Sequence, residues 1–210
     1  SCDSMQIYKN CDIGTAKITQ EEMKGVQHYM IDIIEPNAQF SVFDYCSKTK
    51  EIISDITMRG KLPILVGGTG LYIKSLLNNY DFNSGNKNED LRNYYNNLAT
   101  KYGNQVLIID LDKNNIEHSK IHFNDTKRLI RLLENTNKGT QSNLEQNKKS
   151  EFDYLYICLN QDRDLLYKKI NKRVDLMFES GLLNEVEDLK NKIGFDCQSM
   201  QSIGYKEFKN

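Results

Sequence analysis

Residues 62–70, Leu-Pro-Ile-Leu-Val-Gly-Gly-Thr-Gly, decide the fold class of this 210-residue chain. The apolar run 62–66 predicts a buried strand of a parallel sheet, because such strands are covered on both faces. The glycines that follow stop the strand at a tight turn. Helical spacing at 42–58 and 70–77 brackets it. The order helix, strand, glycine turn, helix predicts an α/β sheet with ligands at the carboxyl ends of its strands.

The rest of the chain shows weaker patterns of the same kinds. Apolar stretches at 29–34 and 154–159 are two further predicted strands. Helical spacing predicts four more helices, at 89–101, 125–134, 163–178 and 183–192. Because consecutive helices occupy the chain between residues 71 and 134 without a strong strand, we expect a helical lobe inserted into the sheet domain.

Two polar, turn-forming stretches, 83–89 and 135–150, have the composition of surface loops. We interpret them as borders of the insert. The predicted organisation is a first part of the α/β core at 1–80, a helical insert at 81–150, and a return to the core at 151–210.

The composition, 39% hydrophobic and 27% charged, is that of a folded globular protein. No apolar run approaches the roughly 20 residues of a spanning helix, and no basic-then-apolar leader opens the sequence, so we expect no membrane association. The five cysteines are odd in number and form no Cys-x-x-Cys pair, which argues against disulfides and zinc. We expect a cytoplasmic protein, although an organelle reached by a removed leader gives the same pattern. With a net charge of −1, any RNA contact must use local basic patches.

The glycine turn at 67–70 has two interpretations. Its backbone N–H groups and the following helix N-terminus form a site for an anion or polar ligand. Alternatively, it is a tight turn in which Thr69 caps the helix. It is not a phosphate-binding Walker loop, since G-x-x-x-x-G-K-[ST] occurs nowhere in the chain.

Asp3 and Gln6 place a carboxylate and a carboxamide three residues apart. Asp can accept a proton, and Gln can bind a purine edge. The simpler alternative for Asp3 is an ordinary capping residue. The stretch 12–17, Asp-Ile-Gly-Thr-Ala-Lys, adds polar groups and a glycine, and by itself indicates only a loop.

Arg128 and Arg131 stand at i, i+3, on one face of a predicted helix where both can meet a phosphate-rich ligand. A solvated helix face is the alternative. The basic stretch 163–173 is diluted by acidic residues, so a solvated amphipathic helix is the default there. The three histidines have no metal-ligand spacing, and no metal site is predicted from the residues.

Taken together and in this order, these segments resemble the tRNA dimethylallyltransferases, also called isopentenyl-tRNA transferases. No single motif decides the resemblance, but its parts span nearly the whole chain. The matching segments are DSMQIY at 3–8, DIGTAK at 12–17, HYMIDI at 28–33, LPILVGGTGLY at 62–72, IHFND at 121–125, KRLIR at 127–131, NKRVD at 171–175 with Gly181 and Leu182, and QSIGYK at 201–206.

The resemblance implies a P-loop NTPase-like parallel sheet core, incomplete at the N-terminus here, with an inserted helical lobe that grips the tRNA anticodon stem-loop. It implies transfer of a dimethylallyl group from dimethylallyl diphosphate to N6 of the adenine 3′-adjacent to the anticodon. Mg²⁺ is expected to assist departure of the diphosphate, with no protein ligand identified. We expect a monomer.

The resemblance also implies roles for individual residues. An exocyclic adenine amine is a weak nucleophile, so a carboxylate that takes its proton is useful, and Asp3 is the expected base. Thr69 and Arg131 are the other expected catalytic residues, and Lys17 joins Arg131 near the diphosphate. The expected tRNA-binding residues are Asp3, Ser4, Met5, Gln6, Thr69, Arg92, Lys127, Arg128, Leu129, Ile130, Arg131, Gln201, Ser202, Ile203, Gly204, Tyr205 and Lys206.

The sequence departs from the family pattern in a few places. The family's glycine-rich phosphate loop is expected before Ser1, so diphosphate binding is expected to be incomplete in these residues. Phe123 and Gln27 stand where proline is usual, and Leu132 stands where alanine is usual. Two alternatives stay open: an adenylate isopentenyltransferase acting on free nucleotides, against which the helical insert argues, and a non-catalytic RNA-binding module.

Overall fold

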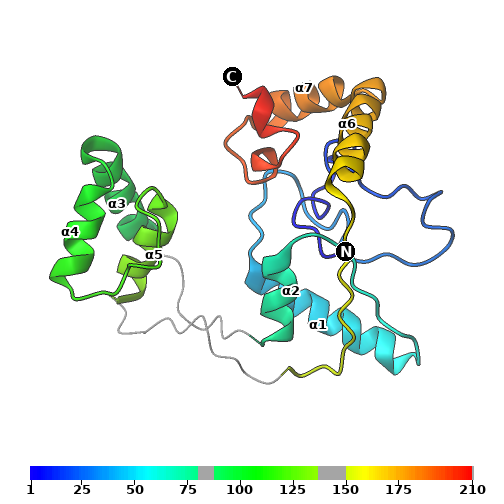
Figure 1. Cartoon of the computed structure of the whole chain (residues 1–210), viewed down its shortest axis with the longest axis horizontal. Coiled ribbons are helices and arrows are strands. Elements are labelled where there is room, and N and C mark those ends of the chain that lie inside the picture. Colours follow the sequence, from blue (N-terminus) through cyan, green and yellow to red (C-terminus); the bar gives the residue numbers. More distant parts are fainter. Residues whose placement is uncertain (80–87, 137–149, 210) are drawn as a thin grey trace. The chain divides into compact units, whose positions relative to one another are not determined.

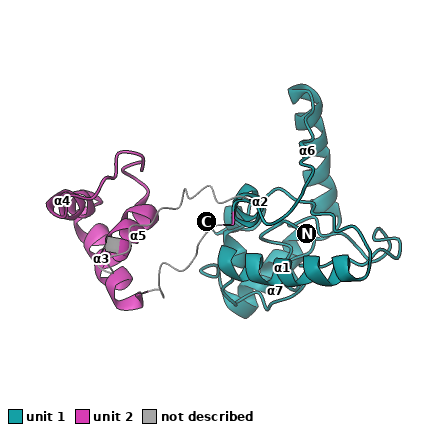
Figure 2. Cartoon of the chain, turned by 90° about the horizontal axis from the view of Figure 1, so that it is seen from below, with its two compact units in different colours: residues 1–78, 150–210 teal, residues 79–149 magenta. Residues whose placement is uncertain are grey.

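The computed structural model describes residues 1–79, 88–136 and 150–209, and these divide into two compact units (Figures 1 and 2). Unit 1 comprises 1–78 with 150–210, and unit 2 comprises 79–149. The borders predicted from the sequence lay at 80/81 and 150/151. Most residues of the two predicted border loops lie outside the described residues. Each unit is described below by itself.

Unit 1 is built mainly from helices and irregular segments. Its helices are α1 (Val42–Met58), α2 (Gly70–Leu77), α6 (Arg163–Glu179) and α7 (Leu182–Ile193), with short 3₁₀ turns η1 (Ser199–Gln201) and η2 (Lys206–Phe208). The predicted helices at 42–58 and 70–77 are confirmed. A capping box of Ser41 and Asp44 starts α1. The helix packs on α2, where the Tyr45 and Tyr72 rings stack with centroids 3.9 Å apart.

Unit 2 is a bundle of α3 (Glu89–Tyr102), α4 (Gln105–Lys113) and α5 (Thr126–Thr136). Its core consists of Tyr95, Leu107, Leu111, Leu129, Ile130 and Leu133. Helices α3 and α5 were predicted, and α4 was not. The apolar run 106–109 in α4 is too short to distinguish a strand from a helix by sequence. In the structure, the core buries Leu107 and Leu111, which lie one helical turn apart, and this packing favours the helix.

The predicted strand at 29–34 is wrong. Met30 and Asp32 have left-handed backbone angles, with φ of 62° and 53°, which a strand does not accommodate. Ile34 forms a parallel bridge with Tyr8, the one isolated bridge among the described residues. This segment is therefore a turn-rich edge beside residues 6–9, and the bridge is its only β-type pairing in the described structure.

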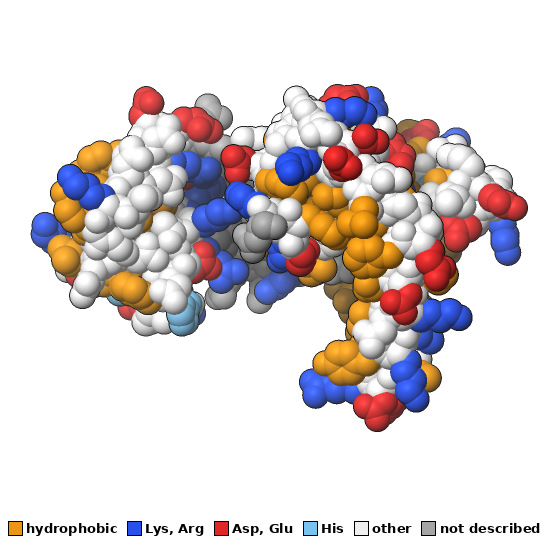
Figure 3. Space-filling model, turned by 90° about the horizontal axis from the view of Figure 1, so that it is seen from above, with side chains coloured by type: hydrophobic (Ala, Val, Ile, Leu, Met, Phe, Trp, Pro, Cys, Tyr) orange, Lys and Arg blue, Asp and Glu red, His pale blue; other side chains and the backbone are white. Residues whose placement is uncertain are grey.

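The predicted strands at 62–66 and 154–159 are not observed as strands either. A strand requires hydrogen bonds to a neighbouring strand. Among the described residues, segment 62–66 has one backbone hydrogen bond to another segment, from the Cys2 N–H to the Val66 carbonyl. The large hydrophobic side chains of both segments are exposed, from 41% at Leu65 to 92% at Leu159. Exposed hydrophobic side chains are visible as orange patches in Figure 3. No helix in the described ranges is long and apolar enough to cross a membrane.

Candidate functional site

The N-terminal segment and the glycine turn lie against each other in unit 1. The Cys2 N–H donates to the Val66 carbonyl (2.7 Å), and the Thr69 N–H donates to the Cys2 carbonyl (3.0 Å). The Thr69 hydroxyl accepts from the Ser4 N–H (3.0 Å) and donates to the Ser4 hydroxyl (3.2 Å). Thr69 occupies the N-cap position of α2, as the second interpretation predicted, but its side chain makes no capping bond to the helix. Of the predicted residues 3–6, Ser4 is thus in direct contact with Thr69.

Gly67 is what allows this close approach. A Cβ at this position would lie 2.5 Å from the Cys2 carbonyl oxygen and 2.8 Å from its Cα. Its φ of 156° is also one that side-chain-bearing residues rarely adopt. At Gly68 a Cβ would meet nothing within 4 Å. Only the first of the two glycines is therefore required by the packing.

Asp3 has the capping role that the sequence left open, and its role as a base stays a prediction. Its Oδ1 accepts from the backbone N–H groups of Met5 (2.8 Å) and Gln6 (3.3 Å), as in a capping turn. Its Oδ2 accepts no hydrogen bond from any residue that the structure describes. Because one oxygen holds the turn and the other is available, capping does not prevent Asp3 from accepting a proton.

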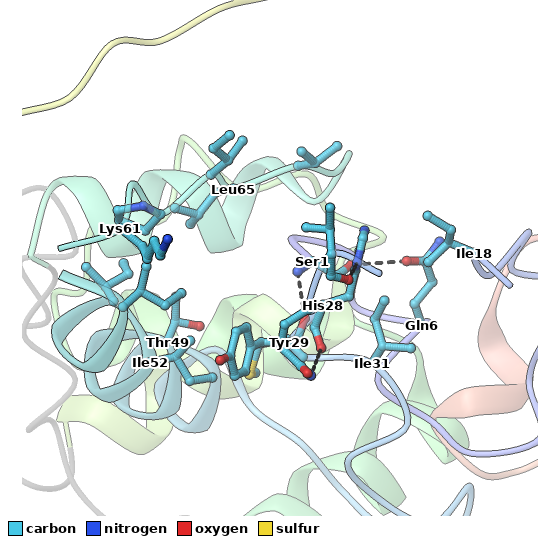
Figure 4. Close-up of a pocket in the computed structure, with 18 of the residues that line it drawn as sticks. Ser1, Gln6, Ile18, His28, Tyr29, Ile31, Thr49, Ile52, Lys61 and Leu65 are labelled. Atoms are coloured by element: carbon cyan, nitrogen blue, oxygen red, sulfur yellow. Dashed lines mark hydrogen bonds between the residues drawn. The ribbon is translucent and has the colours of Figure 1, made fainter. Parts of the chain in front are cut away.

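Gln6 lies beside a cavity of about 860 Å³ in unit 1 (Figure 4). Its amide nitrogen donates to the carbonyls of Thr15 and Ala16, both at 3.3 Å, and its oxygen accepts from the Ser1 hydroxyl at 3.1 Å. These bonds hold the carboxamide against the 12–17 loop. Any contact of Gln6 with a purine would compete with them.

Lys17 is held by protein acceptors. Its ammonium donates to the Tyr8 carbonyl (2.7 Å), Asp12 (2.6 Å) and Asp32 (2.5 Å), and its side chain is 5% exposed. An ammonium has three N–H donors, so these three partners saturate it. In the described structure Lys17 fastens its loop, and its contact with a diphosphate stays a prediction.

Glu185, on α7, was not singled out from the sequence. Its carboxylate accepts from three consecutive backbone N–H groups, of Asp12, Ile13 and Gly14, at 2.8–2.9 Å, and from the Tyr205 hydroxyl at 2.7 Å. Burial and the Glu185 carboxylate raise the pKa of Tyr205, so this hydroxyl remains a neutral donor. Glu185 therefore joins the 12–17 loop to the 201–206 segment.

The 201–206 segment splits into internal and external residues. Tyr205 is fully buried, and its ring occupies the space that a Cβ at Gly14 would need. Ser202 is also buried. Gln201, Ile203 and Lys206 are exposed. Of the predicted tRNA contacts in this segment, these three present side chains to solvent, and Tyr205 holds the segment in place.

In unit 2 the predicted basic residues follow one face of α5. Lys127 and Arg128 are exposed, and Arg128 pairs with Asp125 at 3.3 Å. Leu129 and Ile130 lie in the core of unit 2. Their side chains hold the helix in the bundle. Within this stretch we therefore expect the basic side chains to make any tRNA contact.

Arg92 and Arg131 meet at one carboxylate that sequence reasoning missed. Glu134 Oε2 accepts from Arg92 at 2.6 Å and 3.1 Å and from Arg131 at 3.0 Å. Burial disfavours the ionised form, but the hydrogen bonds from Arg92, the Asn88 N–H and Arg131 outweigh it, so the pKa of Glu134 lies below 4.5. Since the folded-state pKa is lowered, this stabilisation is present above about pH 4.5 and is lost as the pH falls through the folded value.

Residues 6–210 match the family described as IPP transferase. The chain belongs to the IPP transferase family. It is 45% identical over 212 residues to a tRNA dimethylallyltransferase of Oceanobacillus iheyensis, covering 99% of this chain and 68% of that relative. It is 46% identical to a tRNA dimethylallyltransferase of Bacillus anthracis, with the same coverage of both chains.

Solved structures support the same IPP transferase assignment. The tRNA isopentenylpyrophosphate transferase of Bacillus halodurans has a TM-score of 0.67 and 42% identity, covering 98% of this chain and 65% of that one. A eukaryotic dimethylallyltransferase acting on tRNA has a TM-score of 0.70 and 26% identity, covering 98% and 54%. This chain therefore spans about two thirds of the bacterial IPP transferase and about half of the eukaryotic one.

Sequence reasoning missed Glu134 and Glu185 for the same reason. Glu185 lies 171 residues from Gly14, and Glu134 lies 42 residues from Arg92. No local spacing links a carboxylate to partners so distant in the chain. The one available signal was an acidic residue three positions after Arg131, within reach on the same helix.

Proposed function

We propose that this chain catalyses a tRNA prenyl transfer. In this reaction a dimethylallyl group moves from dimethylallyl diphosphate to N6 of the adenine 3′-adjacent to the anticodon. The names of its relatives support the reaction class. The observation that carries the proposal is the binding of the segment that contains Asp3 to Thr69 in the glycine turn. Hydrogen bonds of Cys2 and Ser4, which flank Asp3, join this segment to Thr69. Among the described residues, Asp3 Oδ2 accepts no hydrogen bond.

The chemistry proposed for these residues is a substitution at the allylic carbon. The adenine N6 lone pair forms the new C–N bond, and the C–O bond to the diphosphate breaks, its electron pair leaving with the diphosphate. Oδ2 of Asp3 takes the proton that N6 loses. Oδ1 keeps its backbone bonds throughout, so the base need not reorganise.

Mg²⁺ is proposed as the accompanying ion, where it would neutralise diphosphate oxygens. Within residues 1–79, 88–136 and 150–209, no three His, Cys, Asp or Glu side chains are grouped to hold a metal. No protein ligand is therefore assigned to the ion, and no step is derived through it.

The proposed partner is the anticodon stem-loop, met by the basic side chains of unit 2 and by the exposed residues of 201–206. We further propose a cytoplasmic monomer. Segments 62–66 and 154–159 are proposed to be strands of a P-loop NTPase-like sheet. Their continuous apolar sequences and exposed side chains support this, because such sequences are usually buried between sheet neighbours.

The proposal is tested by incubating the protein with labelled dimethylallyl diphosphate and Mg²⁺. The acceptor is either an anticodon stem-loop or a free adenine nucleotide. We expect label on the anticodon stem-loop at N6 of the adenine and none on free adenine nucleotides. Label on AMP, ADP or ATP instead would indicate an adenylate isopentenyltransferase. Tight stem-loop binding with no transfer would indicate an RNA-binding module, provided that the protein tested is as long as its relatives.

Lys127 and Arg128 are expected to add RNA affinity through phosphates. Each neutralised phosphate contact contributes about 0.9 to the slope of log K against log salt for duplex nucleic acid. Lys127→Ala and Arg128→Ala should each flatten the slope of stem-loop binding by about one unit. The measurement is a binding titration at four salt concentrations. Unchanged slopes in both variants would make this an ordinary solvated helix face.

A further inference from the structure

Glu134 is a fully buried carboxylate placed among cations and backbone donors. Its side chain is 0% exposed, and it accepts the Asn88 N–H at 2.6 Å as well as the bonds from Arg92 and Arg131. An ionised group is rarely buried unless it is paired and hydrogen-bonded. With four N–H donors from three residues, Glu134 meets both conditions.

The cluster is not electrically neutral. Glu134 supplies one negative charge against the two positive charges of Arg92 and Arg131, which leaves one positive charge in excess. The two arginine side chains remain 27% and 38% exposed. The excess charge is therefore on groups that a ligand from solution can reach, whereas the carboxylate is not.

The position of Glu134 also matters for the shape of unit 2. Asn88 is the N-cap of α3, and Glu134 lies in the last turn of α5. The carboxylate therefore joins the start of one helix to the end of another. Arg92, in the first turn of α3, and Arg131, one turn before the end of α5, are thereby drawn to a single point.

We propose that Glu134 is a positioning residue that holds Arg92 and Arg131 side by side, so that the two guanidinium groups bind one phosphate of an RNA backbone together. This inference rests on the proposed function. A guanidinium group that is already fixed loses less freedom when it binds, and its planar fork matches a phosphate. The carboxylate itself does not touch the RNA.

The loss of the Glu134 charge and the loss of its positioning role would change RNA affinity in opposite directions, so the two can be distinguished by experiment. Replacing Glu134 with Gln preserves its size and leaves an oxygen for the Asn88 N–H, while removing one negative charge. If only the charge mattered, RNA binding would tighten. If Glu134 positions the arginines, binding should weaken about tenfold at constant salt, and the salt slope should fall by about one unit, as for one lost phosphate contact.

The matched control is Asp125→Asn, on the N-terminal side of the same helix. It removes the same charge from a partner of Arg128, and the Asn oxygen can keep the bond from the Arg128 N–H. We expect this variant to bind the stem-loop as tightly as wild type or more tightly. Binding of Glu134→Gln that equals the control, in a protein with an unchanged melting temperature, would overturn the inference.

A second variant covers the case in which Glu134→Gln does not fold. Arg92→Lys with Arg131→Lys keeps every charge but replaces both forks with point charges. Positioning predicts at least fivefold weaker stem-loop binding, and binding equal to wild type would overturn it. If the wild-type protein itself does not bind the stem-loop, the proposed function fails. If wild type binds and both variants match it, only the role of Glu134 fails.

Discussion

Gly67→Ala is expected to lower prenyl transfer by about 100-fold or more, because the new Cβ cannot be accommodated without moving the Cys2 backbone. The nearest atoms are main-chain atoms, and they cannot rotate away as the end of a side chain can. The overpacking should cost about 1–3 kcal/mol of stability. More importantly, it should break the two backbone bonds that join Cys2, the neighbour of Asp3, to Val66 and Thr69. A shift of about 1 Å in catalytic geometry can cost about 100-fold in rate.

The measurement is kcat/KM for prenyl transfer, with melting temperature recorded on the same preparation. Gly68→Ala is the matched control, since a Cβ at that position would meet no atom within 4 Å. It should stay within about threefold of wild type, a change of under about 0.7 kcal/mol. Equal activities of the two variants would mean that the contact between Cys2 and the glycine turn does not set the catalytic geometry.

Asp3→Asn is expected to reduce transfer by about 10²- to 10⁴-fold, the usual contribution of a general base, while stem-loop binding is retained. The variant keeps an oxygen in the place of Oδ1, so the bonds from the Met5 and Gln6 N–H groups can persist. What it loses is the ability of the second position to accept a proton. Single-turnover rate and stem-loop affinity should be measured on one preparation.

Asp3→Ala separates the two roles of this side chain. It removes both the base and the capping oxygen, so it should lower the melting temperature as well as the rate, whereas Asp3→Asn should lower the rate alone. Loss of an intramolecular hydrogen bond costs about 0.5–1.5 kcal/mol. Transfer by Asp3→Asn within about threefold of wild type would show that Asp3 is a cap and not the base.

Local features explain where sequence reasoning succeeded. The helices at 42–58 and 70–77 were predicted with the observed bounds, because the apolar spacing of both and the Ser41–Asp44 capping box of the first lie within the helices or directly beside them. It failed where a segment's state depends on its neighbours. The apolar run in α4 becomes a helix because the core of unit 2 buries one face of it. The runs at 62–66 and 154–159 lack the neighbours that would make them strands in the described structure.

By itself, the sequence determined the family, because the order of its motifs can be read from the linear chain. It also predicted the residues on which the proposed chemistry depends. Only the tertiary structure decided which of those residues are available. It places Asp3 with one oxygen unbonded, Lys17 saturated by three acceptors, and Leu129 inside a core. It also supplied the two carboxylates, Glu134 and Glu185, that hold the predicted residues in place. Hydrogen bonds and burial join residues that are distant in the chain, so no local pattern encodes them.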